Sequence, residues 1–96
     1  MIGVFVTFSY QGQLDEPKLC QIAQNAKPKF EGMPGLRSKV FTLRPERREA
    51  TNVYVWDSEE HARAFLTPQM VERVTALYGV APRIEYAAVA ALVENE

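Results

Sequence analysis

Apolar side chains alternate with small or polar ones in four stretches of the chain, which is the pattern typical of β-strands. The first stretch runs from Ile2 to Tyr10, and the others cover residues 36–43, 51–57 and 83–93. In the first and last stretches, apolar residues occupy both sides of the predicted strand. These four stretches predict the strands of one sheet.

The first interval between strands predicts a helix, because apolar residues recur there at steps of three and four. The stripe consists of Leu19, Ile22, Ala23, Ala26 and Phe30. Asp15 or Glu16 can cap this helix, and Pro17 suits its first turn, where no backbone donor is needed. Pro28 lies inside the stripe and is expected to kink or end the last turn.

A second helical region follows the third strand in two pieces. The spacing of Asp57 and Glu60 is that of a capping box, which predicts a helix over residues 58–66. Pro68 at a first-turn position opens another helix, and Gly79 is expected to close it.

The order of these elements is βαββαβ, which predicts an α+β, ferredoxin-like fold over a single domain, residues 1–96. Right-handed crossovers place the helices on one face of a four-stranded antiparallel sheet. The other face then carries the second apolar side of the outer stretches, an area larger than most soluble monomers expose. We therefore expect a homodimer; the alternative is that small alanines and valines are tolerated at the surface.

Composition narrows the class of protein. The 96 residues are 47% hydrophobic and 24% charged, as in an ordinary globular protein, and the net charge of −1 provides no field to hold nucleic acid. The single cysteine, Cys20, excludes an intramolecular disulfide and a cysteine-built metal site. The sequence shows neither a secretory signal nor an apolar run of about 18 residues, so we expect a cytoplasmic protein without membrane contact.

Two short motifs carry a family resemblance. Met33-Pro34-Gly35-Leu36 leads into a strand, and residues 52–66, NVYVWDSEEHARAFL, run from a strand into a helix. Together they resemble the dimeric α+β barrel superfamily, which includes the antibiotic-biosynthesis monooxygenases, and especially its small monooxygenase-like members of the YdhR type. The resemblance implies two ferredoxin-like protomers packed sheet to sheet, each with a pocket between its own sheet and helices.

The resemblance also implies a chemistry. Relatives of this kind oxidise phenolic polycyclic compounds to quinones with O₂ as co-substrate and no metal, flavin or haem. An Asn and a Trp four residues apart on the third strand contact the substrate there, and Asn52 and Trp56 match that spacing. We therefore expect a cofactor-independent monooxygenase acting on a small aromatic or polycyclic phenol. Ala62 departs from the family pattern, in which an aromatic side chain is expected.

The residues of the third strand are suited to such chemistry. Asn52, Tyr54 and Trp56 share one face, because side chains on a strand repeat every two residues. Their amide, phenol and indole groups are donors for an oxyanion that develops on a substrate. The alternative is that Tyr54 and Trp56 are core residues, and that Asn52 bonds across a hairpin or at a bulge.

His61 is the only histidine in the sequence and a candidate general base. It is also a candidate haem ligand, since the superfamily has a haem-degrading branch. Position 61 lies in the first turn of a predicted helix, so an exposed residue is the alternative. Three functions follow from these candidates: the monooxygenase, a non-catalytic ligand-binding or stress-associated barrel protein, and a haem-binding relative.

Basic residues gather on the second strand and the loop after it. They are Arg37, Lys39, Arg44, Arg47 and Arg48. An anion site is one interpretation, but Glu46 and Glu49 interrupt the charge. We expect a solvated hairpin.

Overall fold

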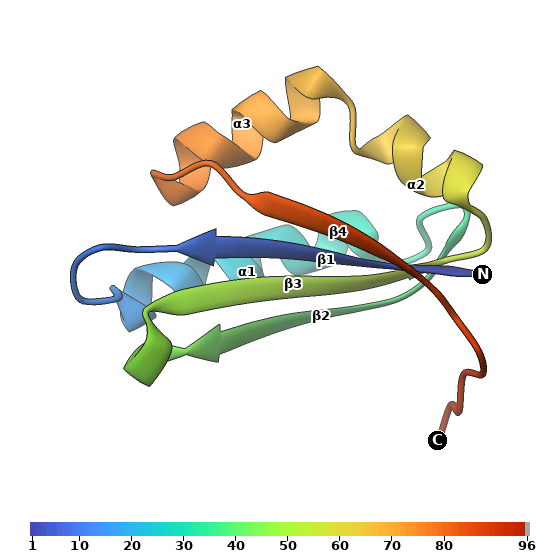
Figure 1. The fold of residues 1–96 in the computed structure, drawn as a ribbon, viewed down its shortest axis with the longest axis horizontal. Helices are drawn as coiled ribbons and strands as arrows, with labels where there is room; N and C mark the ends of the chain where they lie inside the picture. The colour runs from blue at the N-terminus through green and yellow to red at the C-terminus, as the bar shows by residue number, and fades with distance from the viewer. Residues whose placement is uncertain (96) are drawn as a thin grey trace.

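The computed structural model describes residues 1–95. The elements follow in the order β1 (Ile2–Ser9), α1 (Glu16–Phe30), β2 (Leu36–Arg44), η1 (Pro45–Arg47), β3 (Glu49–Trp56), α2 (Glu59–Phe65), α3 (Pro68–Tyr78) and β4 (Arg83–Ala88) (Figure 1). The strands form one antiparallel sheet in the order β2-β3-β1-β4. This is the ferredoxin-like topology that the sequence predicts.

The core lies between one face of the sheet and the helices. Val4 of β1 is paired with Tyr54 of β3, and both side chains are buried on this face. Each α-helix contributes buried side chains to the same cluster: Leu19 and Ile22 from α1, Ala62 from α2 and Tyr78 from α3. The helices therefore cover a single face, as predicted. None of the helices within residues 1–95 has the length and apolar character needed to cross a membrane.

Side chains cap the three helices, and one cap differs from the expectation. Asp15 accepts from the backbone N–H of Lys18, as predicted. Helix α2, however, is capped by Ser58, whose Oγ accepts from the backbone N–H of His61, rather than by Asp57. Asp57, directly after β3, instead donates its N–H to the carbonyl of Gly35, directly before β2, at 2.8 Å. The helix consequently begins one residue later than the capping-box spacing suggested.

Strand β4 is shorter than expected. The alternation of the sequence predicted a strand from residue 83 to 93, whereas β4 ends at Ala88. Its pairing partner β1 starts at Ile2, directly opposite Ala88, and Val89 makes one further bond to the carbonyl of Met1 at 3.3 Å. The apolar residues that follow Ala88 therefore have no strand to pair with.

A β-bulge near the start of β2 changes the direction of its side chains. The register shifts between Leu36 and Ser38, so that Leu36 lies opposite Trp56 while Lys39 lies opposite Tyr54. Lys39 consequently shares the helix-covered side with these aromatic residues, and Arg37 does not. The expectation that Lys39 belongs to a solvated basic hairpin is wrong, because Lys39 is paired with the buried Tyr54 and its amine lies against Phe30 of α1.

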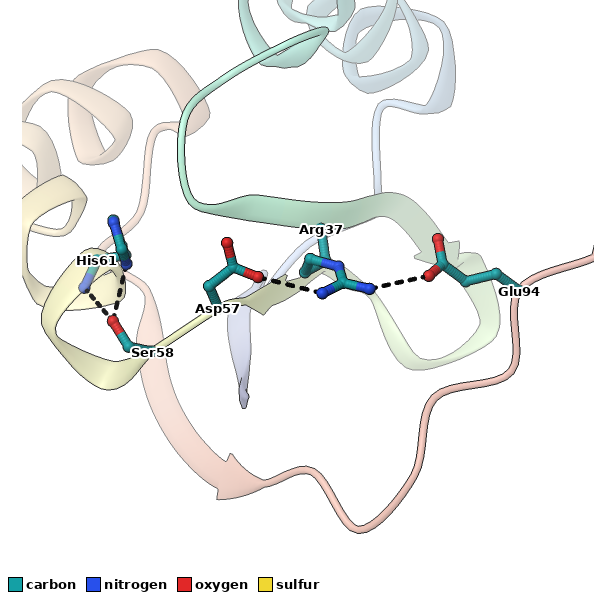
Figure 2. Close-up of polar contacts among 5 residues, drawn as sticks. All are labelled: Arg37, Asp57, Ser58, His61 and Glu94. Atoms are coloured by element: carbon teal, nitrogen blue, oxygen red, sulfur yellow. Dashed lines mark hydrogen bonds and ion pairs between the residues drawn. The ribbon is translucent and has the colours of Figure 1, made fainter.

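The two motifs that carry the family resemblance touch each other in space. Gly35 has φ +83°, and a Cβ built on it would overlap the imidazole of His61. Figure 2 shows His61 beside Ser58, whose Oγ lies 2.8 Å from Nδ1 of the ring.

Arg37 lies between Asp57 and Glu94 and contacts both carboxylates at 3.3 Å (Figure 2). This junction fixes the point at which α2 leaves the sheet.

Gly35→Ala is expected to destabilise the protein more than Gly79→Ala. Both glycines have φ +83°, but nothing lies within 4 Å of a Cβ at Gly79. The left-handed conformation alone costs about 1–2 kcal/mol, so Gly79→Ala measures that penalty and Gly35→Ala adds the overlap with His61. Urea unfolding of both variants gives the comparison.

Replacing His61 by Ala separates the penalty of the left-handed conformation from the overlap with the imidazole ring. In the Gly35→Ala background this second change should recover part of the extra loss, because it removes the overlapping ring. In the Gly79→Ala background it should recover nothing. Equal effects in both backgrounds would contradict the contact.

Candidate functional site

The helix-facing side of β3 carries the predicted row. Asn52 is 5% exposed, Tyr54 3% and Trp56 2%, whereas the residues between them are half-buried on the opposite side. Their alternation onto one face is therefore confirmed. A buried asparagine in mid-strand needs a hydrogen-bond partner, since an unpaired amide in an apolar interior is costly.

Tyr78 of α3 is the partner of Asn52. The amide Nδ2 donates to the Tyr78 hydroxyl at 3.2 Å, and the ring of Tyr78 stacks on Phe8 with 3.8 Å between centroids. Burial raises the pKa of the Tyr78 phenol, and the bond from Asn52 opposes that shift. Tyr78 therefore stays a neutral phenol near pH 7. Because its oxygen accepts from Asn52, its own proton can be donated to a ligand.

Two cavities lie between the sheet and the helices. The first, which we name the aromatic cavity, has a volume of about 210 Å³ and walls that include Phe30, Phe41, Tyr54 and Phe65. The second, the α1 cavity, has a volume of about 260 Å³ and is lined by Leu19, Cys20 and Ala23 of α1. Asn52, Tyr78 and Phe41 line both cavities. The Asn52–Tyr78 pair therefore stands at the boundary between them.

Lys39 reaches the wall of the aromatic cavity from β2. Its Nζ lies 2.9 Å from the Tyr54 hydroxyl and 3.4 Å from the centroid of the Phe30 ring. Burial lowers the pKa of Lys39 to about 7, and burial also raises the pKa of the Tyr54 phenol, with a smaller effect from Tyr78. Sequence analysis assigned Lys39 to a solvated hairpin, although it alternates with the apolar residues Phe41 and Leu43.

The ionisable side chains on the wall of the aromatic cavity are either basic or phenolic. They are the bases Lys29, Lys39 and Arg73 and the phenols Tyr54 and Tyr78. No carboxylate is among the described residues that line it. A cleft lined by one sign of charge concentrates ligands of the opposite sign. The aromatic cavity therefore suits a flat, anionic ligand.

Trp56 lies behind the cavity wall. Its indole stacks on Tyr54, with centroids 6.0 Å apart, and is tilted against Phe65 at 5.4 Å. It lines neither cavity, and its Nε1–H has no hydrogen-bond partner within residues 1–95. The direct contact with substrate that the resemblance implied for Trp56 stays a prediction.

His61 is exposed at the start of α2 and lines neither cavity. Its ring packs on Gly35 and its Nδ1 lies next to the Ser58 hydroxyl. Both contacts are with residues of the junction between the sheet and α2. Within the described residues, no group of three His, Cys, Asp or Glu side chains is placed to hold a metal ion. The proposed roles of His61 in catalysis or haem ligation stay predictions.

Ala62 is completely buried, and α2 contacts both β1 and β3. The departure from the family pattern at this position therefore brings α2 close to the sheet. Phe65, almost one turn later, supplies an aromatic wall to the cavity instead.

Solved structures of similar fold come from several bacteria. A monooxygenase from the gene ActVA-Orf6 of Streptomyces coelicolor, in complex with nanaomycin D, is 19% identical with a TM-score of 0.71, covering 99% of this chain and 92% of its own. The heme-degrading enzyme LmHde of Listeria monocytogenes is 20% identical, with a TM-score of 0.66, covering 88% of this chain and 59% of its own. A monooxygenase-like protein of Listeria innocua is 25% identical, with a TM-score of 0.63, covering 95% of this chain and 57% of its own.

These likenesses establish the fold, and the chain spans little more than half the length of the two Listeria proteins. No curated protein matches the sequence. The family model described as "Putative mono-oxygenase ydhR" matches residues 4–89. Because that match spans most of the chain, the protein belongs to the ydhR mono-oxygenase family.

Proposed function

We propose that the protein is a cofactor-independent monooxygenase that oxidises a small aromatic or polycyclic phenolic compound with O₂. The observation that carries the proposal is the Asn52–Tyr78 pair, which presents a phenolic donor at the boundary of an aromatic cavity. Membership of a mono-oxygenase family supports the reaction class. The similar Streptomyces monooxygenase was solved in complex with the ligand nanaomycin D, which supports a small-molecule ligand for this fold.

The reaction balances without an added reductant. The substrate first loses a proton and becomes an electron-rich phenolate or enolate that can reduce O₂. A ring CH₂ or CH group then becomes a carbonyl with one oxygen atom, and the second oxygen leaves as water (R₂CH₂ + O₂ → R₂C=O + H₂O). The substrate supplies all four electrons. The protein has to favour the anion and exclude water, and donors in an apolar cavity do both.

Each residue of the row has a part in this proposal. Tyr78, held by Asn52, donates to the oxyanion, and the Tyr54 hydroxyl offers a second donor. Trp56 acts by holding the Tyr54 and Phe65 rings in place, and a direct contact with substrate requires one of those rings to move. His61 has no part in binding substrate in the arrangement described.

Asn52→Ala should lower kcat/KM for oxygen uptake by about 10²-fold, the usual effect of removing an oxyanion donor or its support. Oxygen consumption with a panel of anthrones and hydroquinones identifies the substrate on which the variant is measured. Tyr78→Phe should show a similar loss, because it removes the hydroxyl and keeps the ring that stacks on Phe8. Tyr86→Phe is the matched control, since Tyr86 lines neither cavity.

Trp56→Phe should reduce the same rate less than Asn52→Ala does, because the indole lies behind the wall. A larger loss in Trp56→Phe would support the direct contact between Trp56 and substrate that the resemblance implies.

Saturable binding of the panel compounds without any oxygen uptake would contradict the monooxygenase function. The protein would then be a ligand-binding protein.

We also infer that two copies of the chain pack through the face of the sheet that no helix covers. Phe5 and Val40 are large apolar residues exposed there, 39% and 54% respectively, and both lie opposite Val53 in the register. A connected apolar row across three strands favours burial against a second apolar surface. The same row on a second copy supplies that surface, which gives the sheet-to-sheet dimer.

Val40→Asp is expected to convert a dimer into a monomer at micromolar concentration, because each dimer would bury two new unpaired charges. Sedimentation velocity measures the change. Ala64→Asp adds the same charge to an exposed position of α2 and serves as the control. A wild-type protein that sediments as a monomer at these concentrations would contradict the dimer.

A further inference from the structure

The amine of Lys39 has no part in the oxygenation described so far, yet its placement is unusual for a lysine. Its Nζ lies 3.4 Å from the centroid of Phe30, 4.3 Å from Phe41 and 4.2 Å from Tyr54. A lysine near an apolar surface normally extends its charged end into water. The side chain of Lys39 instead directs its end between three rings and towards the Tyr54 hydroxyl.

Lys39 stands between two hollows. On one side it lines the aromatic cavity, and on the other it lines a third hollow of about 300 Å³ between the end of α1 and the start of β2. None of the ion pairs within residues 1–95 includes Lys39. The side chain therefore borders space open to a small ligand, and its amine is not held by a carboxylate.

Two effects act on the protonation of this amine. Burial disfavours the ammonium and lowers the pKa of Lys39 to about 7. The three rings act in the opposite direction, since a cation is attracted to an aromatic face. Near neutral pH the side chain can therefore exist as a free amine and can also carry a proton.

The titratable and charged groups around Lys39 come from every element packed against it. They are Lys27 and Lys29 of α1, Glu31 after α1, Arg37 of β2, Tyr54 of β3, and Arg73 and Tyr78 of α3. Burial alone causes the shift at Lys39, with no neighbouring charge contributing.

We propose that Lys39 is the base of the reaction, a proposal that rests on the monooxygenase function. Its free amine takes the proton from a phenol or enol hydroxyl of a substrate in the aromatic cavity. The O–H bond breaks, the electron pair stays on the oxygen, and an N–H bond forms on Nζ. The resulting ammonium then holds the oxyanion beside the Tyr54 hydroxyl, and Arg73 on the same wall also favours the anion.

This assignment defines the substrate class. The substrate is a flat phenol or enol that is neutral in solution near pH 7 and is bound as its anion. A compound without an ionisable hydroxyl would bind to the aromatic walls without reacting.

The pH dependence of oxygen uptake tests the proposal. In the wild type, kcat/KM should fall about tenfold per pH unit below about pH 7, because the base is then protonated. Lys39→Met should lose about 10²-fold at neutral pH and recover as the pH rises through the pKa of the substrate hydroxyl, since water then removes the proton. A Lys39→Met variant with the wild-type rate and profile would overturn the proposal.

Lys39→Arg separates the base from the positive charge. It keeps a cation near Tyr54 but cannot be deprotonated, so it should bind a preformed anion and still fail to ionise a neutral phenol. Wild-type activity in Lys39→Arg at neutral pH would contradict a proton acceptor at this position. Lys18→Met is the matched control, because Lys18 is exposed near the start of α1 and should leave the pH profile unchanged.

A binding measurement tests the base independently of oxygenation. 4-Nitrophenol absorbs visible light only as its phenolate, so its spectrum shows whether it is ionised when bound. Just below its own pKa, the wild type should bind it as phenolate, and Lys39→Met should bind it as phenol. Phenolate binding without oxygen uptake by any panel compound would reject the monooxygenase but retain the base. Oxygen uptake with phenol bound in its neutral form would reject the base alone.

The pH dependence of the unfolding equilibrium constant checks the folding of the variants, and its direction is predicted. The pKa of Lys39 is lower in the folded protein than its ordinary value of 10.5, so the unfolded chain binds more protons between those values. The unfolding equilibrium constant should therefore decrease with pH, by up to tenfold per unit, from about pH 7 to pH 9.5, before free tyrosines ionise. This pH dependence should be absent from Lys39→Met, and its presence there at full size would contradict a buried amine at Lys39.

Discussion

A polar side chain buried beneath a layer of helices needs a partner inside the protein, and this constraint organises the helix-covered side of the sheet. Asn52 is buried and Lys39 is half-buried, and each ends on a tyrosine hydroxyl, at 3.2 Å and 2.9 Å. The tyrosines in turn are fixed by aromatic neighbours, Tyr78 by Phe8 and Tyr54 by Trp56. Removing either member of a pair leaves the other unsatisfied, at a cost of about 1–3 kcal/mol. The packing of the aromatic rings and the hydrogen bonds to the two tyrosine hydroxyls therefore depend on each other.

The segments by which the family can be identified serve mainly as a structural junction. The carbonyl of Gly35 receives the N–H of Asp57, and the ring of His61 lies over the glycine where a Cβ would otherwise be. This contact sets the start of α2, and Phe65 reaches the aromatic cavity from the same short helix. His61, a prominent candidate when only the sequence is considered, thus has a clear role in positioning the helix.

The order of elements and the shared face of Asn52, Tyr54 and Trp56 could be predicted because both follow from local periodicity. The partners of those residues could not, since Tyr78 is 26 positions from Asn52 and its direction depends on how α3 crosses the sheet. Lys39 was assigned to a solvated hairpin for a different reason. Alternation grouped it with apolar neighbours, but nothing local shows which side of an edge strand a helix covers, and a bulge separates it from Arg37.

The groups that donate to the substrate before it is ionised cannot also act as the base. An amide accepts no proton near pH 7, the two phenols are kept neutral by burial, and a guanidinium group has no acceptor. Lys39 differs because burial disfavours its ammonium. It is paired with Tyr54 in the register, and its neighbour two residues on is paired with Asn52. The proposed base Lys39 and the donor Tyr54 therefore lie on adjacent strands of one sheet, which holds catalytic groups more rigidly than loops do.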